Sequence, residues 1–386
     1  MSAKIGIPRS LFYYKFMPFW EVFFTELGND IVVSGPTNKQ ILDNGVKACV
    51  DEACLPVKVF FGHVIDLMDR ADYILAPRFT SISKGEYICP EFGGLPDMIR
   101  HSLGGLPRLI DTEVNMRKSE KGGIKAAIEV GAMLGAGRRA AVAAYEKAAS
   151  SMKQHCRPFA YELKRPGEGD FNSTVYTAQC SSAHEPKCAA AGQKREAWPY
   201  ACVAQGYVPG KDKDEDRNNK MNWDKDKNSH YCGKDCPNGL KVAVIGHPYN
   251  VYDRHVSMDL LGKLEKYGAE AITIERVDEA DINRQAACLK KPMFWNYGRN
   301  AYGAAMHLAG SGMVDGFICV TSFGCGIDSF VNDLIERRIR KEYSIPFITM
   351  TIDEHSGEAG FNTRLEAFID MLRWRRSHEN NISASR

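Results

Sequence analysis

The feature that most constrains this chain is a repeated pattern of strand, loop, helix, glycine and strand. It runs through "KIGIPRSLFYYKFMPFWEVFFTELGNDIVVSG" (residues 4–35) and again through "KVAVIGHPYNVYDRHVSMDLLGKLEKYGAEAITIE" (residues 241–275). Strands that alternate with helices build a mainly parallel sheet. Any two strand–helix–strand units share this outline, but both copies also carry a proline and tyrosines after the first strand. We therefore predict an α/β protein with two similar parallel-sheet lobes.

The same pattern divides the chain into five stretches. The first α/β lobe is predicted at residues 1–115 and the second at 241–374. An alanine-rich run predicts a helical connector at 116–155. Residues 156–240 form a polar, cysteine-containing insertion, and its run "GKDKDEDRNNKMNWDKDKN" is typical of an exposed loop or a disordered segment. Residues 375–386 are predicted to be a polar tail.

Composition excludes several classes of protein. The formal net charge of +2 leaves no basic footprint for nucleic acid. The start of the chain enters a short apolar strand directly and does not have the pattern of a signal peptide. An aromatic run at residues 11–24 is interrupted by Lys15, Pro18 and Glu21 and is too short to span a bilayer. We expect a cytoplasmic protein that binds neither nucleic acid nor membrane.

Twelve cysteines without a secretory signal indicate metal ligands, redox groups or small core residues rather than disulfides. Three of them fall outside regular apolar patterns. Cys54 comes just before a predicted helix, and Cys89 lies in a predicted Gly- and Pro-rich loop after the strand "DYILAP". Cys325 follows the strand "FICVT" and stands between Gly324 and Gly326.

The positions of these three cysteines suit a metal cluster. Ligands collect beyond the carboxyl ends of parallel strands, and helix N-termini favour negatively charged partners. Thiolates select zinc, copper(I) and iron–sulfur clusters, but the spacing lacks both paired CxxC knuckles and a ferredoxin-like run. Three single cysteines can hold three corners of a cubane and leave one iron for another ligand. Flanking glycines would let backbone N–H groups approach cluster sulfurs. The alternative is that these are ordinary loop thiols.

The other cysteines are weaker candidates. Cys319 is expected in the core, and Cys49 and Cys288 on helices. Six more fall in the insertion, namely Cys156, Cys180, Cys188, Cys202, Cys232 and Cys236. Some of these, with His230, could hold a second metal, but we favour bystanders in a loose segment.

Four polar residues near the expected ligand-binding edge could surround such a site, although no catalytic residue is assigned. His247 and Tyr249 follow a predicted strand, and Glu354 and His355 follow the last one. They could deliver protons or donate hydrogen bonds to a cluster or substrate. The alternative is helix capping and loop ordering, for which Asp353 is suited.

Six stretches in order carry a family resemblance. They are "IGIPRSLFYYKFMPFW", "VDEACLPVKVFFGHV", "KGEYICPEFGGLPDMIR", "VIGHPYNVYD", "TSFGCGIDSF" and "TIDEHSGEAGFNTRLEAF". Together they resemble the acyl-CoA dehydratase activase-related proteins, relatives of the 2-hydroxyacyl-CoA dehydratase subunits and of the double-cubane cluster proteins. The resemblance covers residues 3–115 and 241–374 and leaves the insertion out.

This resemblance implies two flavodoxin-like (Rossmann-like) lobes with an oxygen-sensitive iron–sulfur cluster between them, held by Cys54, Cys89 and Cys325. It also implies a homo- or heterodimer and a separate ATPase activase of the actin–hexokinase type that supplies low-potential electrons. The chain itself has no Walker-type phosphate loop. The resemblance further implies one-electron reduction of a small molecule. In the dehydratase relatives that molecule is a 2-hydroxyacyl-CoA. No CoA-binding signature is evident here, so the substrate stays open.

Several alternatives remain at this stage. An [8Fe–9S] double cubane needs about six thiolates. The two lobes offer only Cys49, Cys54, Cys89, Cys288, Cys319 and Cys325. Because several of these are expected in the core or on a helix, a single [4Fe–4S] cluster ranks higher. The chain would then be an ATP-activated reductase or a dehydratase component, which is an oxidoreductase or a lyase. Otherwise it is a non-catalytic iron–sulfur or zinc protein that acts as an electron carrier, scaffold or maturation factor.

Overall fold

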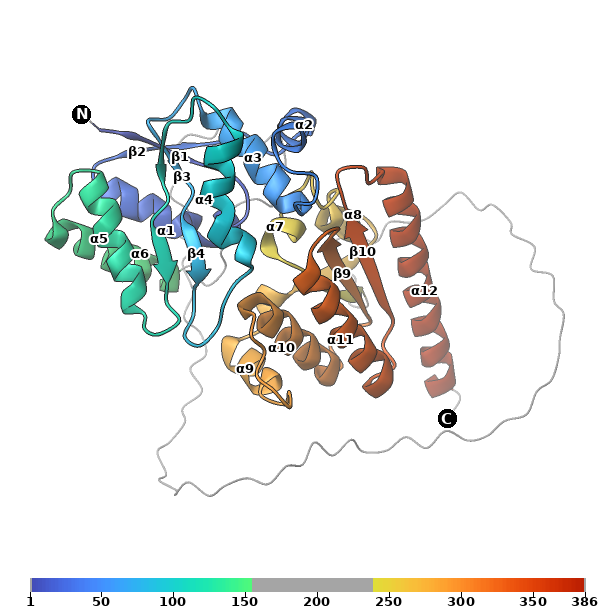
Figure 1. The fold of residues 1–386 in the computed structure, drawn as a ribbon. Coiled ribbons are helices and arrows are strands. Elements are labelled where there is room, and N and C mark those ends of the chain that lie inside the picture. Colours follow the sequence, from blue (N-terminus) through green and yellow to red (C-terminus); the bar gives the residue numbers. More distant parts are fainter. Residues whose placement is uncertain (1, 155–238, 385–386) are drawn as a thin grey trace, which may run out of the picture. The chain divides into compact units, whose positions relative to one another are not determined.

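The computed structural model of the chain describes residues 2–154 and 239–384 (Figure 1). The six insertion cysteines and His230, which were weighed as a second metal site, lie outside the described residues.

The first lobe is built on a four-stranded parallel sheet in the order β2-β1-β3-β5. A small parallel pair, β4 and β6, continues from the ends of β3 and β5. The strands are β1 (Lys4–Ile7), β2 (Asp30–Val33), β3 (Tyr73–Leu75), β4 (Arg78–Ser81), β5 (Arg108–Ile110) and β6 (Glu113–Asn115). The helices are α1 (Tyr13–Glu26), α2 (Lys39–Ala48), α3 (Leu55–Leu67) and α4 (Pro90–Ser102).

The second lobe is built on another four-stranded parallel sheet, in the order β10-β9-β7-β8. Its strands are β7 (Leu240–Ile245), β8 (Ala269–Thr273), β9 (Gly316–Ser322) and β10 (Phe347–Ile352). Its helices are α7 (Pro248–Val251), α8 (Leu260–Lys266), η1 (Ile274–Arg276, a 3-10 turn), α9 (Glu279–Ala286), α10 (Asn296–Ser311), α11 (Gly326–Glu342) and α12 (Glu358–Ala384). Every residue of β9 is buried, as expected for a strand covered on both faces.

The two sheets share one topology. Counted from its own first strand, each lobe has the strand order 2-1-3-4. This confirms the prediction of an α/β protein with two parallel-sheet lobes. In this flavodoxin-like order the connections leave in opposite directions from the first and third strands, which creates a crevice at their carboxyl ends. The crevice lies at β1 and β3 in one lobe and at β7 and β9 in the other.

Side chains along the strands of the second lobe point alternately to the two faces of the sheet, and this divides the buried core into two clusters. Ala243 and Phe317 face a cluster with α10 and α11. Val244 and Ile318 face the opposite side of the sheet. There they join α12 and the core of the first lobe in one continuous apolar cluster. The two lobes therefore share a core.

The connector consists of α5 (Lys121–Met133) and α6 (Arg138–Gln154). The α6 helix packs on α1, where Tyr145 meets the ring of Phe19 edge-on at 5.4 Å. Lys147 also pairs with Glu26 across these helices at 2.6 Å. The connector thus extends the first lobe.

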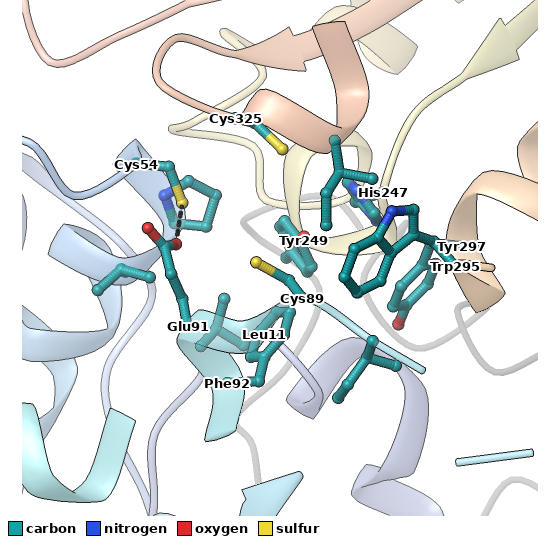
Figure 2. Close-up of a pocket in the computed structure, with 14 residues that line it drawn as sticks. Leu11, Cys54, Cys89, Glu91, Phe92, His247, Tyr249, Trp295, Tyr297 and Cys325 are labelled. Atoms are coloured by element: carbon teal, nitrogen blue, oxygen red, sulfur yellow. Dashed lines mark hydrogen bonds between the residues drawn. The ribbon is translucent and has the colours of Figure 1, made fainter. Parts of the chain in front are cut away.

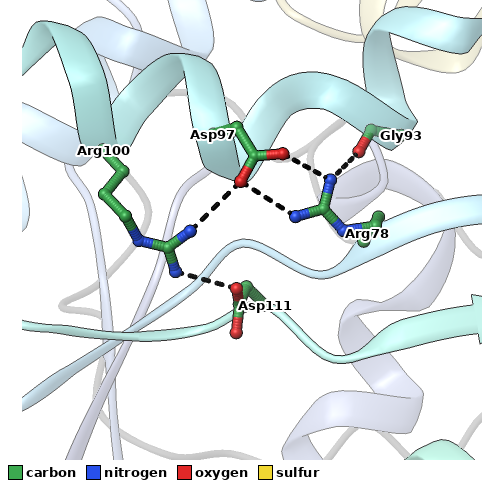
Figure 3. Close-up of polar contacts among 5 residues, drawn as sticks. All are labelled: Arg78, Gly93, Asp97, Arg100 and Asp111. Carbon is green, nitrogen blue, oxygen red and sulfur yellow. Dashed lines mark hydrogen bonds and ion pairs between the residues drawn. The ribbon is translucent and has the colours of Figure 1, made fainter.

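A guanidinium network fixes α4 against the small sheet (Figure 3). Arg78 donates to the Gly93 carbonyl and binds both carboxylate oxygens of Asp97, at 2.8 and 3.0 Å. Arg100 joins the same carboxylate to Asp111, to which it donates at 2.8 Å. The hydrogen bond from Arg78 lowers the pKa of Asp97, which keeps the acceptor ionised. These contacts tie α4 to β4 and to the residue that follows β5.

Three local expectations differ from the structure. The segment after Cys89 was expected to be a loop, but α4 runs through Pro96, because its apolar residues form a buried helical face. The helix that the repeated pattern predicts before Gly268 begins only at Leu260, since Met258 and Asp259 have left-handed φ values of +52° and +54°. The α12 helix continues through residue 384, into the predicted tail.

Candidate metal centre

The three predicted ligand cysteines line one pocket. Cys54, Cys89 and Cys325 line the same small, partly open pocket, with their sulfurs directed into it (Figure 2). Both lobes contribute to the wall, which is mostly apolar and aromatic. It includes Leu11, Ile88, Phe92, Trp295, Tyr297 and Ile327.

Each of these cysteines is the N-cap residue of a helix. Cys54 precedes α3, Cys89 precedes α4 and Cys325 precedes α11. Within the described residues, none of the three side chains makes a capping hydrogen bond to its own helix. Three helix N-termini, each with free N–H groups and the positive end of a dipole, therefore surround the pocket. This arrangement favours thiolates and other anionic groups there.

Strand order explains how distant cysteines meet. Cys325 follows β9, and Cys89 comes from the connection that continues beyond β3, so each lies at the crevice of its own sheet. Cys54 comes from the link between α2 and α3. The turn into Cys325 uses Gly324 at φ +83°, a conformation that side chains rarely adopt, and Gly324 lies against the backbone of Cys54.

Without a metal, two of the thiols are held neutral. Burial raises the pKa of Cys89 to about 11. Burial, followed by the charge of Glu91, raises the pKa of Cys54 well above its usual value. The Cys54 thiol donates to Glu91 Oε2 at 3.2 Å. Binding of a cation at these sulfurs would thus release protons.

His247 lies beside Cys325. Its Nε2 is 2.7 Å from Asp328 Oδ1, its ring stacks on Tyr249 at 4.8 Å, and it meets Tyr297 edge-on at 4.5 Å. Burial lowers the pKa of His247, but Asp328 and Cys325 more than offset this and raise it to about 10. In the described part of the chain, the ring's Nδ1 is buried and has no hydrogen-bond partner.

The spacing of the donor atoms bears on what could bind. Sulfurs that share one tetrahedral zinc ion lie about 3.8 Å apart. Among the described residues, the one set of three or more donors within 4.8 Å of one another is Cys325, His247 and Asp328. The three thiols form no such set, although they line the same space. In this geometry they are not arranged around one small ion, and thiolates are donors that zinc, copper(I) and iron–sulfur clusters all accept.

The remaining predicted polar residues divide into two groups. Tyr249 lines the pocket with His247. Glu354 is instead paired with Lys58, and His355 is exposed, with its backbone N–H donating to Asp353 at 2.7 Å. Neither residue is among those that line the described pocket. Their geometry matches the loop-ordering alternative.

The other cysteines of the described segments do not line this pocket. Cys319 is fully buried in β9, as expected of a core residue. Cys49 is buried, and Cys288 is exposed after α9.

Two acidic residues of the site were missed from the sequence. Glu91 and Asp328 lie in the first turns of α4 and α11, two and three residues after Cys89 and Cys325. Because each cysteine caps its helix, a carboxylate this close after it stays at the same helix end. The patterns "CPE" and "CGID" could have indicated them.

Comparison with known families gives one match. Residues 4–277 match the family described as the CoA enzyme activase uncharacterised domain. The chain belongs to this family. The match contains Cys54, Cys89 and His247, while Cys325 lies beyond its end. Membership confirms the resemblance to activase-related proteins. No curated protein matches the chain.

No helix in the described ranges is both long enough and apolar enough to cross a membrane.

Proposed function

We propose that this chain binds a [4Fe–4S] cluster through Cys54, Cys89 and Cys325 and works as the cluster-bearing component of an ATP-activated redox system. The observation that supports this most is the convergence of three helix-capping thiols in one pocket between the two lobes. Such a cluster, when bound, supplies one-electron reduction at low potential.

The protein's own groups suit this role. The helix N-termini offset the negative charge of thiolates and sulfide. The aromatic rings of Phe92, Trp295 and Tyr297 keep water from much of the pocket. Solvent exposure and hydrogen bonding to sulfur are two of the factors that set a cluster's potential. We assign these residues to tuning the potential rather than to bond chemistry.

The family description, which names a CoA enzyme activase, supports an enzyme partner. We propose that the partner is a separate ATPase of the actin–hexokinase type, and that this chain is a homo- or heterodimer in the cytoplasm. The substrate would be a small molecule, with an acyl-CoA as the first compound to test. A non-catalytic carrier or scaffold would accept the electron but reduce no substrate.

The test is iron and acid-labile sulfide per chain, with the visible spectrum, on protein purified without oxygen. We expect about four irons and four sulfides. Cys325→Ala should lose them, and Cys288→Ala, at an exposed thiol outside the pocket, should keep them. Turnover with the ATPase and a low-potential donor then distinguishes an enzyme from a carrier. Zinc, or no metal in protein never exposed to air, would overturn the proposal.

A second candidate is a single metal ion, such as zinc, bound by Cys325, His247 and Asp328. The observation that favours it is that one donor atom from each of these residues lies within 4.8 Å of the other two. An ion held this way needs neither Cys54 nor Cys89. Metal content that survives Cys54→Ala and Cys89→Ala but is lost in Cys325→Ala would identify it.

A further inference from the structure

His247 is one of the residues that line the apolar and sulfur-rich pocket, and one of its ring nitrogens is unsatisfied among the described residues. Its side chain lines the thiol pocket and is only 9% exposed. In the described segments, its Nδ1 has neither solvent nor a hydrogen-bond partner. Buried ring nitrogens are normally paired, so an orphan at this position points to a ligand.

The ring cannot easily turn to find another partner. His247 directly follows β7, and Pro248 begins the next helical turn after it. Tyr249 is nearly parallel to the ring, with an interplanar angle of 10°, and Tyr297 meets it edge-on. These contacts fix the plane in which the Nδ1 lone pair lies.

Asp328 fixes the other ring nitrogen. Asp328 is 8% exposed, lies in the first turn of α11 and accepts a hydrogen bond from the Nε2–H of His247 at 2.7 Å. A carboxylate on one nitrogen is the usual support of a histidine that binds a metal through the other.

We infer that His247 Nδ1 is the fourth ligand of the cluster, bound to the iron that no cysteine binds, with Asp328 as its positioning residue. This inference rests on the proposed function. Coordination requires the neutral ring: the charged ring first releases its Nδ1 proton to solvent, the Nδ1 lone pair then binds iron, and the Nε2 proton stays in the hydrogen bond to Asp328.

Glu91 is the competing donor in the pocket. Its hydrogen bond from the Cys54 thiol is lost once that thiol is deprotonated, but a carboxylate is a harder ligand than imidazole and suits iron–sulfur iron less well. A neutral imidazole in place of a thiolate makes the cluster one charge less negative, and histidine ligation raises the potential of other clusters. A closed fourth position would also favour outward electron transfer over direct binding of substrate to iron.

The test is pulsed electron paramagnetic resonance on the reduced full-length holoprotein. We expect a strongly coupled nitrogen that changes to the ¹⁵N pattern when only histidine is ¹⁵N-labelled. In His247→Ala this coupling should vanish, and mild oxidation should convert the cluster to a three-iron form. His355→Ala is the matched control, because that side chain is exposed and outside the pocket. Asp328→Asn should retain the coupling but shift the midpoint potential.

The outcomes separate the two proposals. Four irons in the wild type without a histidine nitrogen coupling would overturn the ligand assignment and leave the cluster in place. Loss of the fourth iron in Glu91→Gln rather than in His247→Ala would also overturn it. Absence of any cluster in the wild type would overturn both. The isotope experiment needs no substitution, so it holds even if His247→Ala does not fold.

Discussion

At the scale of single residues, one buried carboxylate fixes the hydrogen bonds of several neighbouring groups. Asp253 is 3% exposed and accepts hydrogen bonds from Tyr14, from Thr37 and from two backbone N–H groups of its own loop. The Thr37 hydroxyl gives its only proton to Asp253. The 2.9 Å contact between Thr37 and His63 therefore requires His63 to donate from Nε2. His63 therefore carries a proton on Nε2, and its Nδ1 is buried.

His63 should make stability depend on pH. Burial, with a smaller contribution from Arg9, lowers the pKa of His63 to about 3. In the unfolded chain the pKa is about 6.5. Between these values the unfolded state binds more protons, so stability falls as pH drops through this window and is unaffected above it. The loss is about 1.4 kcal/mol per pH unit.

The measurement is urea unfolding of the wild type and of His63→Gln at pH 7 and pH 5. Glutamine can still donate to Thr37 but does not titrate. The wild type should lose about 2 kcal/mol more than the variant between the two pH values. Equal losses would mean that His63 charges inside the folded protein.

At the scale of elements, α2 and α3 approach at backbone distance. A Cβ atom at Gly62 would lie 1.9 Å from the Ile41 carbonyl oxygen, and one at Gly45 would lie 1.9 Å from that of Lys58. The two glycines therefore set the packing of these helices. Because Cys54 caps α3, the same contact helps to place a proposed ligand.

Gly62→Ala should force the two helices apart. We expect a loss of about 1–3 kcal/mol, measured by urea unfolding, and a lower iron content. Gly94→Ala is the matched control, because it is also helical but has no atom within 4 Å of its added Cβ. That variant should be about 0.5–1 kcal/mol more stable than the wild type. A similar loss at both positions would show that the helix contact is not the cause.

The elements also show what the sequence could predict. Apolar runs such as Phe317 to Val320 predict buried strands, and the strand-end rule places Cys325 and Cys89 at sheet crevices. The α4 helix was hidden, because Gly94 and Pro96 oppose helix propensity and only tertiary burial of its apolar face overrides them. The pairing of Lys58 with Glu354 could not be predicted from the sequence, because it depends on how two lobes far apart in sequence pack together.

At the scale of the whole described body, polar ties cross between the lobes over their shared core. Lys58 on α3 is 3% exposed and pairs with Glu354 after β10. Glu86 pairs with Arg299, and Tyr87 exchanges backbone hydrogen bonds with the segment before α10. The segment that ends at Cys89 is therefore held by the second lobe. We expect the two lobes to unfold together.

Removal of one partner of the buried pair should cost more than removal of an exposed one. Glu354→Ala leaves Lys58 buried without its carboxylate, and we expect a loss of about 3 kcal/mol in the free energy of unfolding. A second change, Lys58→Met, should recover much of it, since an uncharged chain of similar length can fill the site. Glu26→Ala, at the exposed pair with Lys147, should cost less than about 1 kcal/mol.

Urea unfolding of the three variants, followed by both fluorescence and circular dichroism, provides the measurement. Coincident transitions support one cooperative body. Two separate transitions in the wild type would contradict it.

The shared pocket also fixes an order of events during protein synthesis. Cys54 and Cys89 leave the ribosome while Cys325 is still more than two hundred residues from being made. At bacterial or eukaryotic synthesis rates this delay is roughly 10–50 s. During that time the nascent first lobe presents two thiols whose third partner does not yet exist. Insertion of the proposed cluster is therefore expected to follow synthesis of the second lobe, because only then are all three thiols present.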